Sequence, residues 1–375
     1  MAQLLTGGTD NVSTARAAVL TAPRTFDIQD LEIPAPGADA GLMRIEACGI
    51  CAADVPVWRG ETSFELPVVL GHEIVGRAEQ VGPDAARRWQ IDNGDRIIVE
   101  RWIPCGHCTN CLAGNYRLCV REIDGHRLFY GGAPTMLAPS LYGGYAEYLY
   151  LHPNSVVYKV SPDVPASVVP LFTPLGNAIS WIQKVGGAGM GDTIVIQGPG
   201  QEGLAAVVVA KASGAAQIIV TGLAQDAARL EMAKELGATA VINVEEADQV
   251  DVVRRLTRGE MANVVLELTS SPDLRPLEAA MEMAGTGATI VLPSLHAERG
   301  LRFDSERFAN KMLTLRGAWG RDRSSVFAAI AMIESGRFGL DRLSTHHFGL
   351  DEIDLALRTV AREANPDALH ASIVF

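Results

Sequence analysis

A surplus of positive charge is missing from this sequence. Its 44 aspartates and glutamates outnumber its 32 lysines and arginines, so the formal net charge is −12. A surface of that sign repels the phosphate backbone of nucleic acids and the anionic headgroups of membranes. We therefore expect neither a nucleic-acid partner nor a membrane partner.

The sequence also lacks an uninterrupted apolar run long enough to cross a membrane. Its most apolar region, residues 203–220, contains Lys211 and two glycines, and this pattern is typical of a buried helix followed by a buried strand. Residues 1–14 show neither the basic start nor the apolar stretch of a secretory signal. We expect a cytoplasmic protein whose thiols stay reduced.

Cysteine is scarce, with six in 375 residues. A chain of this length predicts about two domains, and its 48% of hydrophobic residues is ample for a core without disulfides. Four of the cysteines nevertheless crowd into the stretch "CGHCTNCLAGNYRLC". Their clustering in a reduced protein points to metal binding rather than to disulfides.

The clustered cysteines have the spacing C-x2-C-x2-C-x7-C, and they are Cys105, Cys108, Cys111 and Cys119. Each two-residue gap forms a tight turn, so four thiolates can converge on one tetrahedral ion. Zinc is the usual metal for four sulfur ligands, and a closed ligand set is structural. The alternatives are an iron–sulfur cluster or unbound thiols.

A second group of candidate ligands lies upstream. Cys48 and Cys51 form a C-x-x-C pair that could be a redox motif, but no fitting helix start follows it. The stretch "LGHEIVG" sets His72 beside Glu73 among apolar residues. Burying a carboxylate is costly without compensation, and metal coordination together with Cys51 supplies it. The alternative is an ordinary core histidine.

The middle of the chain has the order strand, glycine loop, helix. The β-rich run "TIVIQ" precedes Gly198, Gly200 and Gly203, and an apolar helix follows. The first glycine permits a tight turn, the second lets the backbone approach a pyrophosphate, and the third lets the helix pack on the strand. Strands and helices then keep alternating, which predicts a doubly wound parallel sheet that binds a dinucleotide.

The choice between NAD and NADP depends on the end of the second strand. That position usually carries an acid for the ribose of NAD, and here it is Gly222. No arginine or lysine follows before Arg229 to attract a 2′-phosphate, and Asp226 could reach the ribose instead. We slightly favour NAD over NADP. We expect Glu202 to point away from the pyrophosphate, which it would repel.

Together these motifs resemble the zinc-containing medium-chain dehydrogenase/reductase family, the superfamily of alcohol, sorbitol and threonine dehydrogenases. The resemblance runs from about Ala15 onward, and "PLGNA" is most like the threonine and polyol branch. Besides the cysteine lobe and the glycine loop, the matching motifs are "GIC--D" (Cys51, Asp54), "GHE" (His72, Glu73), "NGDRI" (Asn93 to Ile97), "GGYAEY" (Gly143 to Tyr148) and "PLGNA" (Pro174 to Ala178).

The resemblance implies an α/β protein with a GroES-like, β-rich catalytic domain plus a doubly wound Rossmann domain. Residues 1–170 and 321–375 would form the catalytic domain, which carries the structural zinc lobe at about 105–119. Residues 171–320 would form the Rossmann domain, and the active site would lie between the two. The family also implies a homodimer or homotetramer acting on a small-molecule substrate.

The resemblance further implies a catalytic zinc held by Cys51 and His72, with Glu73 as a permanent or exchangeable ligand. Asp54 would orient His72 through the second ring nitrogen. Three positions depart from the family pattern. Ala53 stands where a serine or threonine normally contacts the substrate oxygen, Pro56 where a histidine often ends the proton relay, and Thr173 where an acid or cysteine normally contacts the zinc.

These departures leave three functions open. A positioned acid or base contributes about 10²–10⁴-fold in rate, and the hydroxyl of Thr173 is our candidate replacement. We favour a zinc-dependent NAD(P) oxidoreductase that interconverts a secondary alcohol or polyol and its ketone. The second reading is a reductase of a polarised C=C or C=N bond with a weak or absent catalytic zinc. The third is a nucleotide-binding protein without catalysis.

Overall fold

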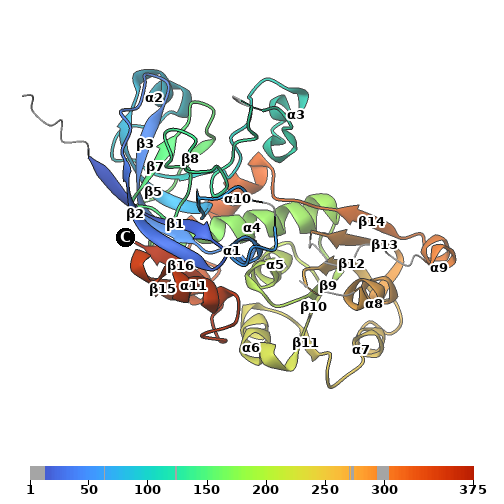
Figure 1. The fold of residues 1–375 in the computed structure, drawn as a ribbon. Helices are drawn as coiled ribbons and strands as arrows, with labels where there is room; N and C mark the ends of the chain where they lie inside the picture. The colour runs from blue at the N-terminus through green and yellow to red at the C-terminus, as the bar shows by residue number, and fades with distance from the viewer. Residues whose placement is uncertain (1–12, 63, 123–124, 270, 272–273, 294–303) are drawn as a thin grey trace, which may run out of the picture.

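The computed structural model describes residues 13–62, 64–122, 125–269, 271, 274–293 and 304–375, and it contains three β-sheets (Figure 1). A six-stranded sheet lies on one side of the molecule. The seven-stranded sheet and the small three-stranded sheet lie on the other. No helix among the described residues is long and apolar enough to cross a membrane.

The seven-stranded sheet joins the N-terminal part of the chain to its last strand. Its central strand β3 is buried along most of its length and pairs antiparallel with β5, β7 and β16. Its strands are β3 (Gly41–Gly49), β5 (Glu73–Val81), β6 (Arg96–Val99), β7 (Tyr148–Leu151), β8 (Val157–Lys159), β15 (Ser344–Phe348) and β16 (His370–Val374). The three-stranded sheet contains β1 (Thr14–Ala22), β2 (Thr25–Glu32) and β4 (Val68–Val69).

The six-stranded sheet is parallel, with the order β11-β10-β9-β12-β13-β14. Its strands are β9 (Thr193–Gln197), β10 (Gln217–Gly222), β11 (Ala240–Asn243), β12 (Ala262–Glu267), β13 (Ala284–Leu292) and β14 (Thr314–Gly317). From β9 the chain winds outward to β11, then returns to the other side of β9 and winds outward to β14. The strand order therefore reverses at β9, the place where such sheets bind nucleotides.

Helices cover both sheets and connect their strands. The helices before the six-stranded sheet are α1 (Asp54–Trp58), α2 (Pro83–Trp89), α3 (Thr109–Leu112) and α4 (Phe172–Ile179). Those within or after it are α5 (Gln201–Ala212), α6 (Ala227–Leu236), α7 (Gln249–Leu256), α8 (Arg275–Met283), α9 (Ser305–Asn310), α10 (Arg323–Glu334) and α11 (Ile353–Val360).

Helix α4 joins the two halves of the molecule (Figure 1). All eight of its residues are buried, and it packs against α5 on one side and α10 on another. One continuous hydrophobic cluster includes Ala47 and Val75 of the seven-stranded sheet, α4 itself, and Ile194 and Ile196 of β9. Because this core is shared, the two sheets are held in a fixed relation where the candidate site lies.

The fold class predicted from sequence is confirmed: a β-rich unit is combined with a doubly wound parallel sheet. The periodic patterns explain why. Strand β9 is apolar on both faces because helices lie on both sides of it, and α5 is buried from Gly203 to Ala210 because it fills the layer between β9 and α4. The boundaries at residues 170 and 320 stay a prediction.

Candidate active site

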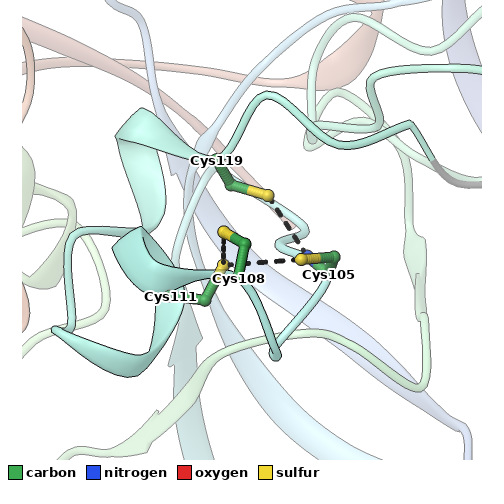
Figure 2. Close-up of side chains that lie close together, drawn as sticks. All are labelled: Cys105, Cys108, Cys111 and Cys119. Carbon is green, nitrogen blue, oxygen red and sulfur yellow. Dashed lines mark hydrogen bonds between the residues drawn. The ribbon is translucent and has the colours of Figure 1, made fainter.

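The four clustered cysteines converge in the lobe around α3 (Figure 2). Their sulfur atoms all lie within 4.8 Å of one another, and none forms a disulfide. Burial would raise the pKa of Cys105, but the backbone N–H groups of His107 and Cys108 lower it to about 6. Burial and the neighbouring thiols raise the pKa of Cys111 to about 12. A cation would let all four thiols ionise together, so this set fits a structural zinc.

The second predicted group is also brought together. One ligand atom each from Cys51, His72 and Glu73 lies within 4.8 Å of the other two. Strand pairing produces this convergence, because Gly49 at the end of β3 lies opposite Glu73 at the start of β5. Cys51 is two residues past that pair, and His72 immediately precedes it. Sulfur, nitrogen and oxygen ligands in a set of three are typical of a catalytic zinc with an open position.

Glu73 lies in a space that Gly49 leaves free. A Cβ atom at Gly49 would stand 2.3 Å from Oε2 of Glu73, so no other residue fits there without displacing the carboxylate. The same Oε2 lies 3.4 Å from Nε2 of His370, a buried residue at the start of β16. Oε1 of Glu73 is buried and has no partner among the described residues. One oxygen therefore stays available for a metal.

Asp54 is placed to orient His72, as the sequence predicts. It lies in the first turn of α1 with 2% exposure, and its Oδ1 is 3.4 Å from Nδ1 of His72. The hydroxyl of Tyr145 donates to Oδ2 at 2.8 Å. Burial would raise the pKa of Asp54, but His72 and Tyr145 hold it below its ordinary value. The negative charge of Asp54 beside Nδ1 favours the tautomer that carries its proton there, which would leave Nε2 to bind a metal.

Negative charge dominates this group of residues. Burial raises the pKa of Cys51 well above its ordinary value, and Glu73, Asp54 and Glu202 raise it further. A thiol surrounded by carboxylates ionises only if a cation offsets the repulsion. The donor set and its charge therefore both fit zinc, held by Cys51, His72 and Glu73.

Thr173 lies in the first turn of α4, where it is buried and its hydroxyl has no partner among the described residues. Asn177, one helical turn later, donates from Nδ2 to Oε1 of Glu202 at 2.9 Å. The carboxylate of Glu202 is thus directed toward α4, and its charge raises the pKa of Cys51. Burial, with a smaller contribution from the charge of Glu73, raises the pKa of Glu202 itself to about 7. No sequence motif indicated that Glu202 would approach the candidate metal ligands.

The glycine loop has the geometry expected of a pyrophosphate cradle. Gly198 has a φ of +97°, a value that favours glycine, and Gly200 caps the start of α5. A Cβ atom at Gly203 would lie 2.0 Å from the carbonyl oxygen of Gly198, so the helix can approach the loop only without a side chain there. The loop follows β9, where the strand order reverses. The amide groups at the start of α5 can then face a phosphate.

Gly222 ends β10 beside this loop. A Cβ atom added at Gly222 would lie 3.0 Å from the side chain of Pro199. Asp226, the candidate ribose ligand, is 4% exposed. Its Oδ2 accepts from the backbone N–H of Leu223 at 2.9 Å, and its Oδ1 pairs with Arg362 at 2.5 Å. Both oxygens of Asp226 therefore have partners within the protein, so its role as a ribose ligand loses support.

Buried polar atoms without partners gather where the loop, α4 and the metal ligands meet. Among the described residues they include Glu73 Oε1, Thr173 Oγ1, Asn177 Oδ1, Gln201 Nε2 and Glu202 Oε2. Native proteins leave few such atoms unpaired, and ligands commonly supply the missing partners. Surface hollows of about 310 and 450 Å³ lie elsewhere, and neither is lined by these residues.

We predict that Tyr145→Phe destabilises the protein by about 1–3 kcal/mol at neutral pH, because Oδ2 of the buried Asp54 loses its donor. The pKa of Asp54 is depressed in the folded state, so its contribution is present above the unfolded pKa and is lost as pH falls through the folded one. Urea unfolding at pH 7 and at a series of pH values from 4 down to 2 measures both effects. Tyr148→Phe, which removes an exposed bond to Glu79, is the control. Equal losses for the two variants would contradict the prediction.

We predict that Glu202→Gln stabilises the cofactor-free protein at pH 8. Burial raises the pKa of Glu202 to about 7, so stability falls as pH rises from the unfolded pKa through 7. The gain should be of the order of 1–3 kcal/mol at pH 8 and close to zero near pH 4. Thermal unfolding across this range measures it. Glu231→Gln, at an exposed pair with Lys234, should change stability little at either pH.

Comparison with known proteins identifies the family to which this chain is similar. Residues 37–162 match the family described as alcohol dehydrogenase GroES-like domain, and residues 203–335 match the family described as zinc-binding dehydrogenase. The chain is 36% identical to a probable alcohol dehydrogenase of Mycobacterium tuberculosis H37Rv, covering 93% of this chain and 95% of the relative. It is 30% identical to an erythritol/L-threitol dehydrogenase of Mycolicibacterium smegmatis, covering 92% and 94%.

A solved structure supports the same assignment. A protein from Sinorhizobium meliloti 1021, described as a zinc-binding dehydrogenase and bound to NADP, superposes with a TM-score of 0.83 at 25% identity. The match covers 97% of this chain and 100% of that one. Both halves of the fold, the two cysteine-containing ligand groups and the glycine loop are therefore explained by one ancestry. The chain belongs to the zinc-containing medium-chain dehydrogenase/reductase family, and it is an NAD(P)-dependent oxidoreductase.

Proposed function

We propose that the protein interconverts a secondary alcohol or polyol and its ketone at the group formed by Cys51, His72 and Glu73. One observation carries the proposal: three different ligand atoms converge within 4.8 Å, with a carboxylate oxygen of Glu73 still unpaired. When bound there, zinc polarises the carbon–oxygen bond as a Lewis acid, and NAD(P) exchanges the hydride. Glu202 lies within the glycine loop, between Gly200 and Gly203, and its charge raises the pKa of Cys51. The loop therefore lies near the proposed metal ligands.

The chain's own residues supply positioning and exclude water. Asp54 holds the imidazole of His72 in one tautomer, and Tyr145 fixes Asp54 in turn. His370 contacts the oxygen of Glu73 that faces β16. These residues are 0–3% exposed, which strengthens each charge interaction relative to water.

Proton transfer needs a group other than those usual in the family. Ala53 precedes α1 and Pro56 lies within it, and neither side chain carries a proton. Thr173 and Glu202 have buried oxygens without partners on the adjoining helices. The hydroxyl of Thr173 is therefore our candidate to contact the substrate oxygen, and Oε2 of Glu202 is the second polar atom left without a partner among the described residues.

We favour NAD over NADP as the cofactor. Glu245 accepts a hydrogen bond from the backbone N–H of Ala224 at 2.6 Å, which places a carboxylate beside the loop that follows Gly222. A 2′-phosphate bound there would be repelled. Arg362, the basic residue beside this loop, is already paired with Asp226.

Reduction of a C=C or C=N bond is the second candidate, and the non-polar side chains at Ala53 and Pro56 favour it. Such a substrate requires less help at oxygen, so the missing relay would matter less. The two functions differ in their need for the metal beside Cys51.

We further propose a homodimer or homotetramer in the cytoplasm. Strand β14 is the edge of the six-stranded sheet and its residues are mostly exposed, so a second copy could pair with it. All six cysteines are free, as expected for a reducing compartment.

We predict two zinc ions per chain in protein purified without added metal. Cys51→Ser should remove one ion and reduce oxidation of secondary alcohols with NAD at least a hundredfold, because it removes a ligand of the proposed catalytic zinc. Cys105→Ser is the matched control: it should remove the other ion and lower the melting temperature. Metal analysis, calorimetry and a panel of alcohols measure these effects.

Two outcomes would count against alcohol dehydrogenation. One is a single zinc ion, lost in Cys105→Ser but not in Cys51→Ser, with turnover of enones or imines instead. The other is binding of NADH without turnover of any member of the panel, which would support a protein without catalysis.

A further inference from the structure

Arg101 lies directly beside the candidate metal ligands. Strands β5 and β6 pair with Val75 opposite Ile98 and Gly76 opposite Ile97. Arg101 follows the end of β6 by two residues, and its backbone carbonyl accepts a hydrogen bond from the N–H of Tyr130 at 2.8 Å. The charges of Asp54, Cys51 and Glu73 all act on the guanidinium of Arg101.

The guanidinium of Arg101 is held by aromatic rings rather than by acids. It stacks over Phe129 at 5.0 Å and over Trp102 at 5.6 Å. Among the described residues, no carboxylate lies within ion-pair distance of it and no acceptor receives a hydrogen bond from it. Its Nε is buried without a partner. Five N–H donors in a fixed plane are therefore left for something outside the protein.

The nearby acids are already engaged. Asp54 accepts from Tyr145 and contacts His72. Glu100, the neighbour of Arg101, pairs with Arg321 at 2.9 Å, and both side chains are 5% exposed. Burial lowers the pKa of Arg101, yet an arginine remains charged in proteins. The side chain of Arg101 is half-buried and its buried Nε has no partner, so we expect an anion to bind the guanidinium during function.

We propose that Arg101 binds an anionic group of the substrate, so that the substrate is an alcohol that also carries a carboxylate or a phosphate. This inference rests on the proposed function, which requires an alcohol as substrate. The hydroxyl of that alcohol would approach Cys51 and His72, while its anionic oxygens would reach Arg101. A planar guanidinium binds two such oxygens in parallel. Stacking on Phe129 and Trp102 fixes that plane in advance, which reduces the entropy lost on binding.

The nucleotide is the other possible source of anionic oxygens. Its pyrophosphate is expected at Gly198, Gly200 and Gly203, on the six-stranded sheet. Arg101 follows β6 of the seven-stranded sheet, and the charges that act on its guanidinium include those of Asp54, Cys51 and Glu73. We therefore assign Arg101 to the substrate, and nucleotide affinity serves as an arm of the test.

The test compares substrates that differ in charge alone. Lactate, 3-hydroxybutyrate and 4-hydroxypentanoate are paired with their uncharged amides, and hydroxypropyl phosphate replaces the carboxylate by a phosphate. Binding to the complex with NADH is measured by calorimetry, and oxidation with NAD is measured in parallel. The tighter of carboxylate and phosphate identifies the anionic group, and the best chain length reports the span between the hydroxyl and Arg101.

We predict that Arg101→Gln weakens binding of the best acid about 10–100-fold and changes binding of its amide less than about threefold. Arg101→Lys should recover part of the loss, since it keeps the charge without the planar fork. Arg127→Gln is the matched control, because this exposed arginine also stacks on Trp102, at 4.8 Å, but donates to a backbone carbonyl. It should bind acids as the native protein does.

Three results would overturn the assignment: equal binding of acid and amide by the native protein, an equal loss for both in Arg101→Gln, or weaker binding of NADH itself in that variant. Failure of the proposed function would look different. No alcohol, charged or neutral, would then be oxidised, while calorimetry would still report whether Arg101 selects anions.

Discussion

The constraint on which this structure depends is the burial of like charges between two sheets. Asp54 and Glu73 are buried close to Cys51, and the charges of Glu73, Asp54 and Glu202 raise the cost of ionising its thiol. Hydrogen bonds offset part of that cost, since Tyr145 donates to Asp54 and Asn177 donates to Glu202. A divalent cation held by Cys51, His72 and Glu73 would offset the remainder and would supply Lewis-acid chemistry at the same place. Stability and chemistry thus have the same origin here.

Helix α4 makes that arrangement possible, because it is packed against both halves of the molecule. The residues that face the site from α4, Thr173 and Asn177, are one turn apart on a helix that is buried throughout. The helix therefore cannot shift without disturbing the shared core. Rigid support of this kind keeps polar atoms unpaired in the cofactor-free state, ready for ligands that satisfy them.

Features that depend on local spacing could be predicted from the sequence. The cysteine lobe, the glycine loop and the pair His72–Glu73 are each encoded in a few neighbouring residues, and the structure brings each set together. Contacts across long separations could not be predicted. Arg101 and His370 reach the site through the segment after β6 and through the return of the chain at β16, for which no motif exists. Tyr145 lies in the motif "GGYAEY", but that motif does not reveal its hydrogen bond to Asp54. The ion pair between Asp226 and Arg362 could not be predicted for the same reason, because Arg362 lies far along the chain.

The contact between Glu73 and His370 has a consequence for biosynthesis. These residues are 297 positions apart, and β16 pairs with β3 only after nearly the whole chain has left the ribosome. A nascent chain contains Cys51 and His72 early, but β16, whose His370 contacts Glu73, has not yet been synthesised. Metal captured at that stage would be solvent-accessible and exchangeable, and the later pairing of β16 with β3 would enclose it.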